Sequence, residues 1–280
     1  MKPLSLLKAT AVALLASALV ASASIDRSIE KSFPMKPGAK VLVDISGGTI
    51  TVKVGEAGRI DLVVEQVVKA DTEAEADEIL ANYEITAEAD GDTVRFITKS
   101  NRKDWKWSGI ASGPRLRQKV YLLVPADTDL NLDTSGGSIG IDGEISGTVR
   151  ADTSGGSINV SGGSGDMNLD TSGGSITVGR ALGKLRADTS GGSIRVDYVG
   201  PNAGDVNCDT SGGSIHIGVD PKGNFDLYAD TSGGRVKVEG LALDIHKKDR
   251  THVSGKVNAG GARLRADTSG GNITIEAAKG

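Results

Sequence analysis

Asp-Thr-Ser-Gly-Gly-Ser-Ile, at residues 133–139, is the stretch of this sequence that decides the fold. A fixed period near 20 residues is typical of stacked repeat units rather than of a conventional globule. The spacings between successive copies are 19, 18, 18, 21, 21 and 37 residues, so the last interval predicts one degenerate repeat near Asp249. The motif begins at Asp133, Asp152, Asp170, Asp188 and Asp209, and variants begin at Asp230 and Asp267.

Each repeat is predicted to form two short strands joined by a Ser-Gly-Gly corner. Apolar and polar residues alternate before the corner, where Leu185, Ala187 and Thr189 share one side, and again after it, where Ile194 and Val196 do. Glycine pairs allow positive φ angles and close approach of stacked backbones. Near-identical copies at near-constant spacing favour an all-β, right-handed parallel β-helix, or solenoid, with 18–21 residues per coil. An antiparallel meander is the alternative.

Stacking has an electrostatic consequence, because the Asp of each motif points outward if the neighbouring Thr points inward. Carboxylates about 4.8 Å apart repel by roughly 1 kcal/mol in water. An Asx-turn, in which Asp accepts the backbone N–H two residues on, would offset part of this repulsion and help to build the corner. Calcium bridging the carboxylates is the alternative, but we interpret the column as structural. The predicted structural ladder consists of Asp133, Asp152, Asp170, Asp188, Asp209, Asp230 and Asp267.

Two more outward columns precede each Asp at intervals of two residues. Arg residues are separated by Asn in one column, and basic residues tend to lie between acidic ones in the other. We expect cross-strand pairs on this face to contribute about 0.2–1 kcal/mol each, so that Arg186→Glu destabilises the fold more than Lys279→Glu. In chain order the columns are Asn131, Arg150, Asn168, Arg186, Asn207, Tyr228, Arg265 and Asp129, Thr148, Asp166, Lys184, Asp205, Asp226, Arg263.

The first 23 residues read as a secretory signal peptide. Lys2 and Lys8 precede an apolar stretch that ends in Ala-Ser-Ala at residues 21–23. No stretch reaches the roughly 20 apolar residues of a transmembrane helix. Without the two signal lysines, 30 basic residues face 36 acidic ones, and the resulting charge of −6 argues against nucleic acid as a partner. Cys208 is the only cysteine and is expected to be a small buried apolar residue.

Residues 24–126 are predicted to form an N-terminal cap and the first coil or coils, followed by solenoid repeats over residues 127–280. One helix is expected, because Thr72 and Glu75 form a capping box before an amphipathic run. Strands are predicted at residues 40–45, 49–54, 60–68, 93–99 and 118–124.

The segment from Asn101 to Gly113 holds the candidate ligand-binding residues. Trp105 and Trp107 stand among basic residues that include Lys103 and Lys106, so the two rings could clamp a sugar or meet an anionic surface. The alternative is that they close a hairpin against the cap.

No catalytic residue, metal site or cofactor site is predicted. His216, His246 and His252 lack the spacing of metal ligands, and the sequence has no phosphate-binding loop or nucleophile elbow. A glycan-processing lyase or hydrolase on a β-helix scaffold would need one singular cluster that breaks the repeat.

The repeats, the early Val-Asp-Ile-Ser-Gly-Gly-Thr-Ile at residues 43–50 and the late Val-Asn-Ala-Gly-Gly at residues 257–261 resemble the bacterial putative-adhesin domain family. The resemblance runs from about Lys36 to Ala277 and implies a β-helical cell-envelope protein without catalytic residues. We therefore expect an exported, non-catalytic, adhesin-like β-solenoid, periplasmic or at the cell surface, that binds an envelope glycan or protein. The alternative is the glycan-processing enzyme.

Overall fold

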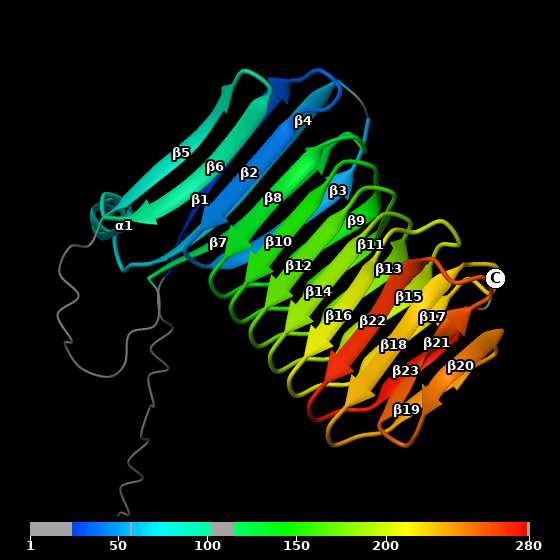
Figure 1. The fold of residues 1–280 in the computed structure, drawn as a ribbon. Helices are drawn as coiled ribbons and strands as arrows, with labels where there is room; N and C mark the ends of the chain where they lie inside the picture. Colours follow the sequence, from blue (N-terminus) through cyan, green and yellow to red (C-terminus); the bar gives the residue numbers. More distant parts are fainter. Residues whose placement is uncertain (1–23, 57, 102–114, 279–280) are drawn as a thin grey trace, which may run out of the picture.

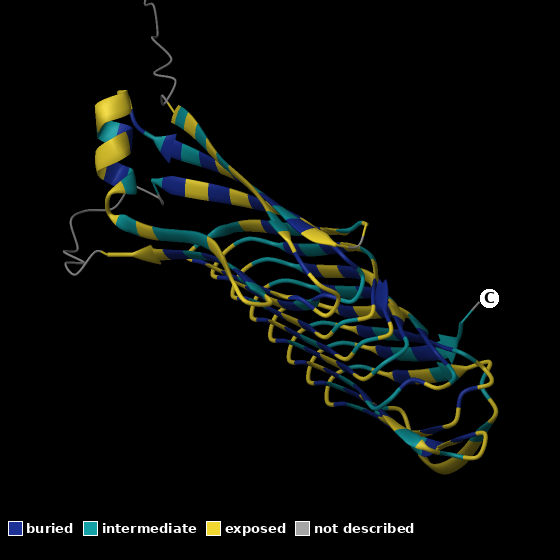
Figure 2. Cartoon of the chain, turned by 90° about the horizontal axis from the view of Figure 1, so that it is seen from above, coloured by how far each residue is buried: buried dark blue, intermediate teal, exposed yellow. Residues whose placement is uncertain are grey.

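The computed structural model describes residues 24–56, 58–101 and 115–278. They form an all-β structure with one helix, in which two long sheets face each other along the molecule (Figure 1). We call the 11-stranded sheet A and the 12-stranded sheet B. Buried residues alternate with exposed ones along most strands (Figure 2). The predicted all-β fold with long parallel stretches and one helix is therefore confirmed.

The strand order along each sheet differs from the order in the chain. Sheet A runs β1 (Ser24–Pro34), β4 (Arg59–Lys69), β7 (Leu116–Val124), β3 (Gly48–Val54), β9 (Ile139–Ile145), β11 (Ile158–Gly163), β13 (Ile176–Ala181), β15 (Ile194–Val199), β17 (Ile215–Val219), β23 (Ile273–Ala277), β19 (Val236–Glu239). Sheet B runs β20 (Leu243–Lys248), β21 (His252–Val257), β18 (Phe225–Thr231), β22 (Ala262–Thr268), β16 (Val206–Thr210), β14 (Leu185–Thr189), β12 (Met167–Thr171), β10 (Val149–Thr153), β8 (Asp129–Thr134), β2 (Lys40–Ile45), β6 (Thr93–Ser100), β5 (Tyr83–Asp90).

Each repeat crosses from sheet B to sheet A at its Ser-Gly-Gly corner. Strands of successive repeats are parallel and in register, so that Asp152 lies opposite Asp133 on one side and Asp170 on the other. This parallel pairing excludes the antiparallel meander for successive repeats. The register is fixed as well, because a one-residue slip would turn every buried side chain outward.

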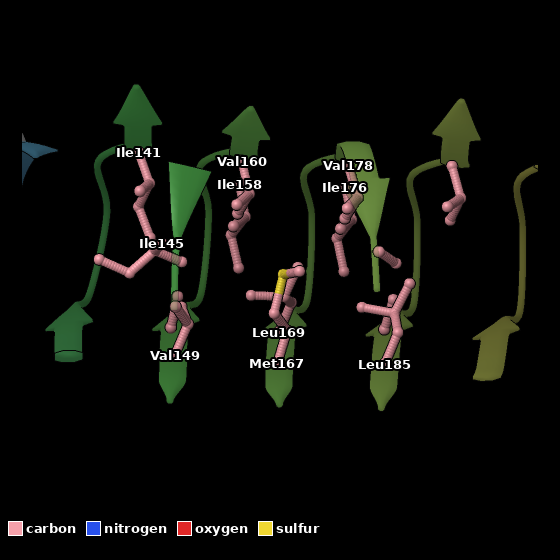
Figure 3. Packing of buried hydrophobic residues seen from close by; sticks show 14 of the residues in the cluster. Ile141, Ile145, Val149, Ile158, Val160, Met167, Leu169, Ile176, Val178 and Leu185 are labelled. Carbon is pink, nitrogen blue, oxygen red and sulfur yellow. The ribbon is translucent and has the colours of Figure 1, made fainter. Parts of the chain in front are cut away.

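The core consists of short apolar rows that both sheets contribute. Ile158 and Val160 stack on Ile176 and Val178 in sheet A, and Met167 lies in the facing row of sheet B (Figure 3). Each fully buried Ile, Leu or Val side chain contributes about 1.5–3 kcal/mol relative to exposure. Because the gap between the sheets is filled by such side chains, the protein needs few aromatic residues.

Threonine, rather than aspartate, closes each corner by hydrogen bonds. The Thr171 hydroxyl donates to the carbonyl of Gly156 in the neighbouring coil at 2.8 Å and accepts the N–H of Gly174 at 3.3 Å. The expected Asx-turn is therefore wrong as the source of the corner. Equivalent pairs of bonds are made by Thr153, Thr189, Thr210, Thr231 and Thr268.

The second glycine of each corner is required by close backbone approach. A Cβ added to Gly174 would lie 2.0 Å from the carbonyl oxygen of Gly156, whereas one added to Gly173 meets nothing nearer than 3.5 Å. Among the corner glycines, only Gly48 of the early copy at residues 43–50 has a positive φ angle, 139°. At the later corners, only close approach of the two expected reasons for the glycine pair therefore applies.

The last coil does not follow chain order. β22 and β23 lie between the coil of β16 and β17 and the coil of β18 and β19. β20 and β21 form an antiparallel hairpin that pairs with the outer edge of β18. The expectation of a degenerate coil near Asp249 is therefore wrong, because those residues belong to the hairpin (Figure 1).

The N-terminal strands extend the same two sheets. β2 and β3 stack on β8 and β9, and their side chains share the core of the repeats. The helix α1 spans Glu73–Leu80, and its N-cap Thr72 accepts the Glu75 N–H at 3.2 Å, as the capping box predicts. β1 and β5, which the sequence pattern did not indicate, pair antiparallel at the edges of the sheets.

Candidate functional site

The candidate ligand-binding residues Trp105, Trp107, Lys103 and Lys106 lie outside the described residues. The expected signal peptide, residues 1–23, also lies outside them. Within the described part of the chain, the outer face of sheet B gathers most of the residues that the sequence pattern singled out.

An unbroken column of carboxylates runs along this face. Its central members are held in adjacent parallel strands by the register of sheet B. Burial is the main cause that raises the pKa of Asp133 and Asp188 above its usual value, and the neighbouring carboxylates raise it further. Arg150 and Arg186 act in the opposite direction on Asp133 and Asp188 respectively, without cancelling the increase. In spatial order the column is Asp44, Asp133, Asp152, Asp170, Asp188, Asp209, Asp267 and Asp230.

The neighbouring column supplies an arginine to every second coil. Arg186 Nε lies 2.8 Å from Asp188 Oδ2, and Arg265 Nε lies 2.5 Å from Asp267 Oδ2. Because β22 lies between β16 and β18, Arg265 separates Asn207 from Tyr228, and the alternation continues without a break. The spatial order is Asn131, Arg150, Asn168, Arg186, Asn207, Arg265, Tyr228.

The third column, which we call the charge row, alternates in sign along the sheet except at the neutral Thr148, which lies between two acidic coils. Arg263 donates to Asp205 through its backbone N–H at 2.9 Å and through Nη2 at 2.7 Å. These bonds, the backbone one first, lower the pKa of Asp205. In spatial order the charge row is Lys40, Asp129, Thr148, Asp166, Lys184, Asp205, Arg263, Asp226, Lys256, Asp244.

A groove of about 470 Å³ lies where these columns cross β14, β16 and β22. Next to it the ring of Tyr228 is 39% exposed, and the Arg265 guanidinium lies over that ring at 5.0 Å from its centroid. The groove therefore combines planar donors, planar acceptors and an adjacent aromatic surface on a rigid sheet. Its lining residues are Arg186, Asp188, Asp205, Val206, Asn207, Asp209, Arg263 and Arg265.

Sequence reasoning missed one cluster, which lies at the end of the Asp column. His252 is 9% exposed, its Nδ1 lies 3.0 Å from Asp230 Oδ1, and its Nε2 lies 3.2 Å from Ser254 Oγ. The Tyr228 ring packs edge-on against the imidazole, with 4.9 Å between centroids. No spacing in the sequence could reveal the cluster, because the pairing of β18 with β21 brings Asp230 and His252 together.

In the described ranges, no group of three or more His, Cys, Asp or Glu side chains is placed to hold a metal ion. Among the same residues, no helix has both the length and the apolar character needed to cross a membrane.

Comparison with known proteins places the chain in a family. The sequence pattern of the family described as Toastrack DUF4097 matches residues 126–276, more than half of the chain. The chain belongs to the Toastrack family. The Toastrack match includes every strand that lines the groove. No curated protein matches the chain.

Several solved structures are similar to this Toastrack chain at low identity. A putative adhesin from Bacteroides fragilis is 14% identical with a TM-score of 0.40, covering 89% of this chain and 97% of its own. A putative cell adhesion protein from Clostridium sporogenes is 12% identical with a TM-score of 0.32, covering 89% and 99%. A putative lipid binding protein from Parabacteroides distasonis is 11% identical with a TM-score of 0.33, covering 89% and 96%. Likenesses this remote assign no ligand to the Toastrack chain.

Proposed function

We propose that this protein is an exported, non-catalytic, adhesin-like module of the cell envelope that binds a surface glycan through the groove on sheet B. The proposal includes residues 1–23 as the export signal and a right-handed solenoid with 18–21 residues per coil. A position in the periplasm or at the cell surface follows from the same proposal, and a surface protein is the alternative ligand.

The observation that supports a glycan is the chemistry of the groove. Sugar hydroxyls both donate and accept hydrogen bonds, so they are matched by a surface that places guanidinium, carboxylate and amide groups side by side. Arg186, Asn207 and Asp209 supply one of each within the lining. Tyr228 offers an exposed aromatic face beside them, on which the C–H face of a sugar ring can pack. The parallel sheet holds these groups in place before binding, which reduces the entropy lost on association.

A glycan array with the mature protein tests this proposal, with Asn207→Ala as the test variant. The matched control is Asn159→Ala, which removes the same side chain from the outer face of sheet A. We expect Asn207→Ala to weaken binding of the best glycan by about tenfold, or about 1.4 kcal/mol, and Asn159→Ala to leave it unchanged. Equal loss in both variants, or no glycan bound, would contradict the proposal.

One observation favours the second candidate, a glycan-processing hydrolase. Asp230, His252 and Ser254 form a hydrogen-bonded series in which each imidazole nitrogen has the partner that it has in acyl-transfer enzymes. Such a series suits removal of an ester-linked acyl group from a sugar. It ranks second because β21 pairs with β18 and β20 on its two sides, so the backbone N–H groups beside Ser254 are not arranged as an oxyanion hole.

A product-release assay with acylated glycans separates the two candidates. The binding protein is expected to release nothing above the uncatalysed rate. Turnover that is abolished by Ser254→Ala and retained by Ser232→Ala, a change in a corner serine, would establish the hydrolase instead.

A further inference from the structure

The coil of β22 and β23 is held by contacts on both of its faces rather than by its place in the chain. β22 is in parallel register with β16 over residues 264–268 and with β18 over residues 262–268. The Thr268 hydroxyl donates to the Gly213 carbonyl at 2.8 Å, and the Thr231 hydroxyl donates to the Gly271 carbonyl at 2.8 Å. The inserted coil therefore receives the same corner bonds as any other coil of the stack.

The slot that holds this coil is acidic on both sides. In the charge row, Asp205 belongs to one wall and Asp226 to the other, and Arg263 lies between them. If β18 stacked directly on β16, as chain order requires, Asp226 would take the place opposite Asp205. Like charges directly opposite each other destabilise a sheet, whereas opposite charges stabilise it. The slot therefore selects a basic coil.

The side chains of the coil, rather than its position in the sequence, determine whether it fits between two acidic coils. Residues 263–273 differ from residues 184–194 at only two of eleven positions, namely Arg for Lys184 and Asn for Ser193. The coil that contains Lys184 also lies between two acidic coils, those of Asp166 and Asp205. A basic coil with these side chains thus fits between acidic neighbours wherever the chain supplies it.

The connection to the inserted coil is short and strained. Residues 258–261 join β21 to β22, which lie on opposite sides of β18. Asn258 has a φ of 53°, the only positive value for a non-glycine residue in the described ranges, and Gly260 has a φ of 73°. The Asn258 side-chain amide holds the turn closed by donating to the carbonyls of Pro221 and Gly223 at 3.0 and 2.6 Å. Short strained hinges favour exchange of the element that follows them.

We propose that residues 262–277 form a donor coil that can leave its own slot and fill the same slot in a second copy of this chain. The product is a swapped dimer in which Arg263 of each chain binds Asp205 of the other. This inference does not depend on the proposed glycan binding.

Cysteine cross-linking in the full chain tests the exchange. On a Cys208→Ala background, chains carrying only Asn207→Cys are mixed with chains carrying only Arg265→Cys, refolded together at high concentration and oxidised. These two positions face each other across β16 and β22, so a disulfide between chains reports a swapped coil. The control mixture pairs Asn207→Cys with Tyr228→Cys, which the donor coil keeps two strands apart.

We expect several-fold more cross-linked dimer in the test mixture than in the control. Adding Asn258→Ala should raise the yield further, because it removes both hinge bonds and disfavours the closed turn. Light scattering of the unmodified chain after the same refolding should show a dimer that persists on dilution. Equal cross-linking in both mixtures, or an unmodified chain that refolds only to monomer, would overturn the proposal.

Discussion

The Arg263 guanidinium binds the Asp205 carboxylate with Nε and Nη2 at 3.1 and 2.7 Å from Oδ2, although the two residues are 58 positions apart in the chain. The Arg263 side chain is exposed and that of Asp205 is about half-exposed, so the pair by itself contributes little to stability. Its effect comes from its place in the charge row, where it separates Asp205 from Asp226.

Reversing this charge should destabilise the fold. Arg263→Glu would put three acidic side chains in adjacent strands, and we expect a loss of about 1 kcal/mol, or a melting temperature about 2–4 °C lower. Arg235→Glu is the control, since Arg235 is exposed and has no ion pair with the described residues. Thermal unfolding followed by circular dichroism measures both, and equal melting temperatures would show that the row has no energetic role.

The two glycines of one corner should differ sharply in how much stability is lost when each is replaced by alanine. Gly174→Ala places a methyl group against the Gly156 carbonyl and should cost about 3 kcal/mol, because the coils must separate to admit it. Gly173→Ala has room for its Cβ and should change stability by less than about 0.5 kcal/mol. Urea unfolding midpoints compare the two variants. Similar midpoints would mean that close approach does not determine the corner.

Stability should rise as the pH falls from neutral into the mildly acidic range. Burial raises the folded-state pKa of Asp133, Asp188 and Asp267 above the ordinary value of 3.8. A group with a raised folded pKa binds protons more readily in the folded state, so its stabilising effect is present at low pH and is lost as the pH rises through that pKa. Melting temperatures between pH 7 and pH 4 test the direction.

At still lower pH, the stability of the fold should decrease. Hydrogen bonds lower the pKa of Asp205 and Asp249, whose contributions are present above 3.8 and are lost as the pH falls through their folded values. The melting temperature should therefore pass through a maximum on the acidic side of neutral. Asp188→Asn should reduce the increase in melting temperature between pH 7 and the maximum, and it should leave the decrease at lower pH where it is. A melting temperature that only decreases below pH 7 would contradict the assignment.

The single thiol should report global unfolding. Burial, with the neighbouring Asp188 and Asp209, raises the pKa of Cys208 to about 12, and the side chain is fully enclosed. Iodoacetamide at pH 8 should leave the native protein unmodified and alkylate it completely in denaturing urea, because the thiolate is the reactive form. Mass spectrometry measures the change. Rapid alkylation without denaturant would show that this coil opens locally.

Local sequence patterns were enough to predict the parallel stack. The recurring corner and the alternation of residues such as Leu185 and Ala187 determine which side chains face inward, and identical copies have one register that buries all of them. The helix was predictable for a similar reason, since Thr72 and Glu75 mark its start within a few residues.

The spatial order of the coils could not be predicted from the apolar pattern, because every coil has the same one. The coils differ in the charges on their outer face, and the charge row in chain order indicates where the order changes. Asp205 and Asp226 follow each other there without a basic residue between them, and Arg263 is the residue that the structure places in this break. The cluster around His252 depends on a hairpin that no repeat predicts. The sequence pattern did not indicate β1, because the charged Arg27 occupies one of its partly buried positions.

The charge row also restricts how this chain can change in length. A duplication of one charged coil would set two side chains of the same sign opposite each other in the charge row, whereas a duplication of an acidic coil together with its basic neighbour would not. The number of charged coils should therefore change in steps of two, and only a coil with a neutral residue in this row, like that of Thr148, could be added singly.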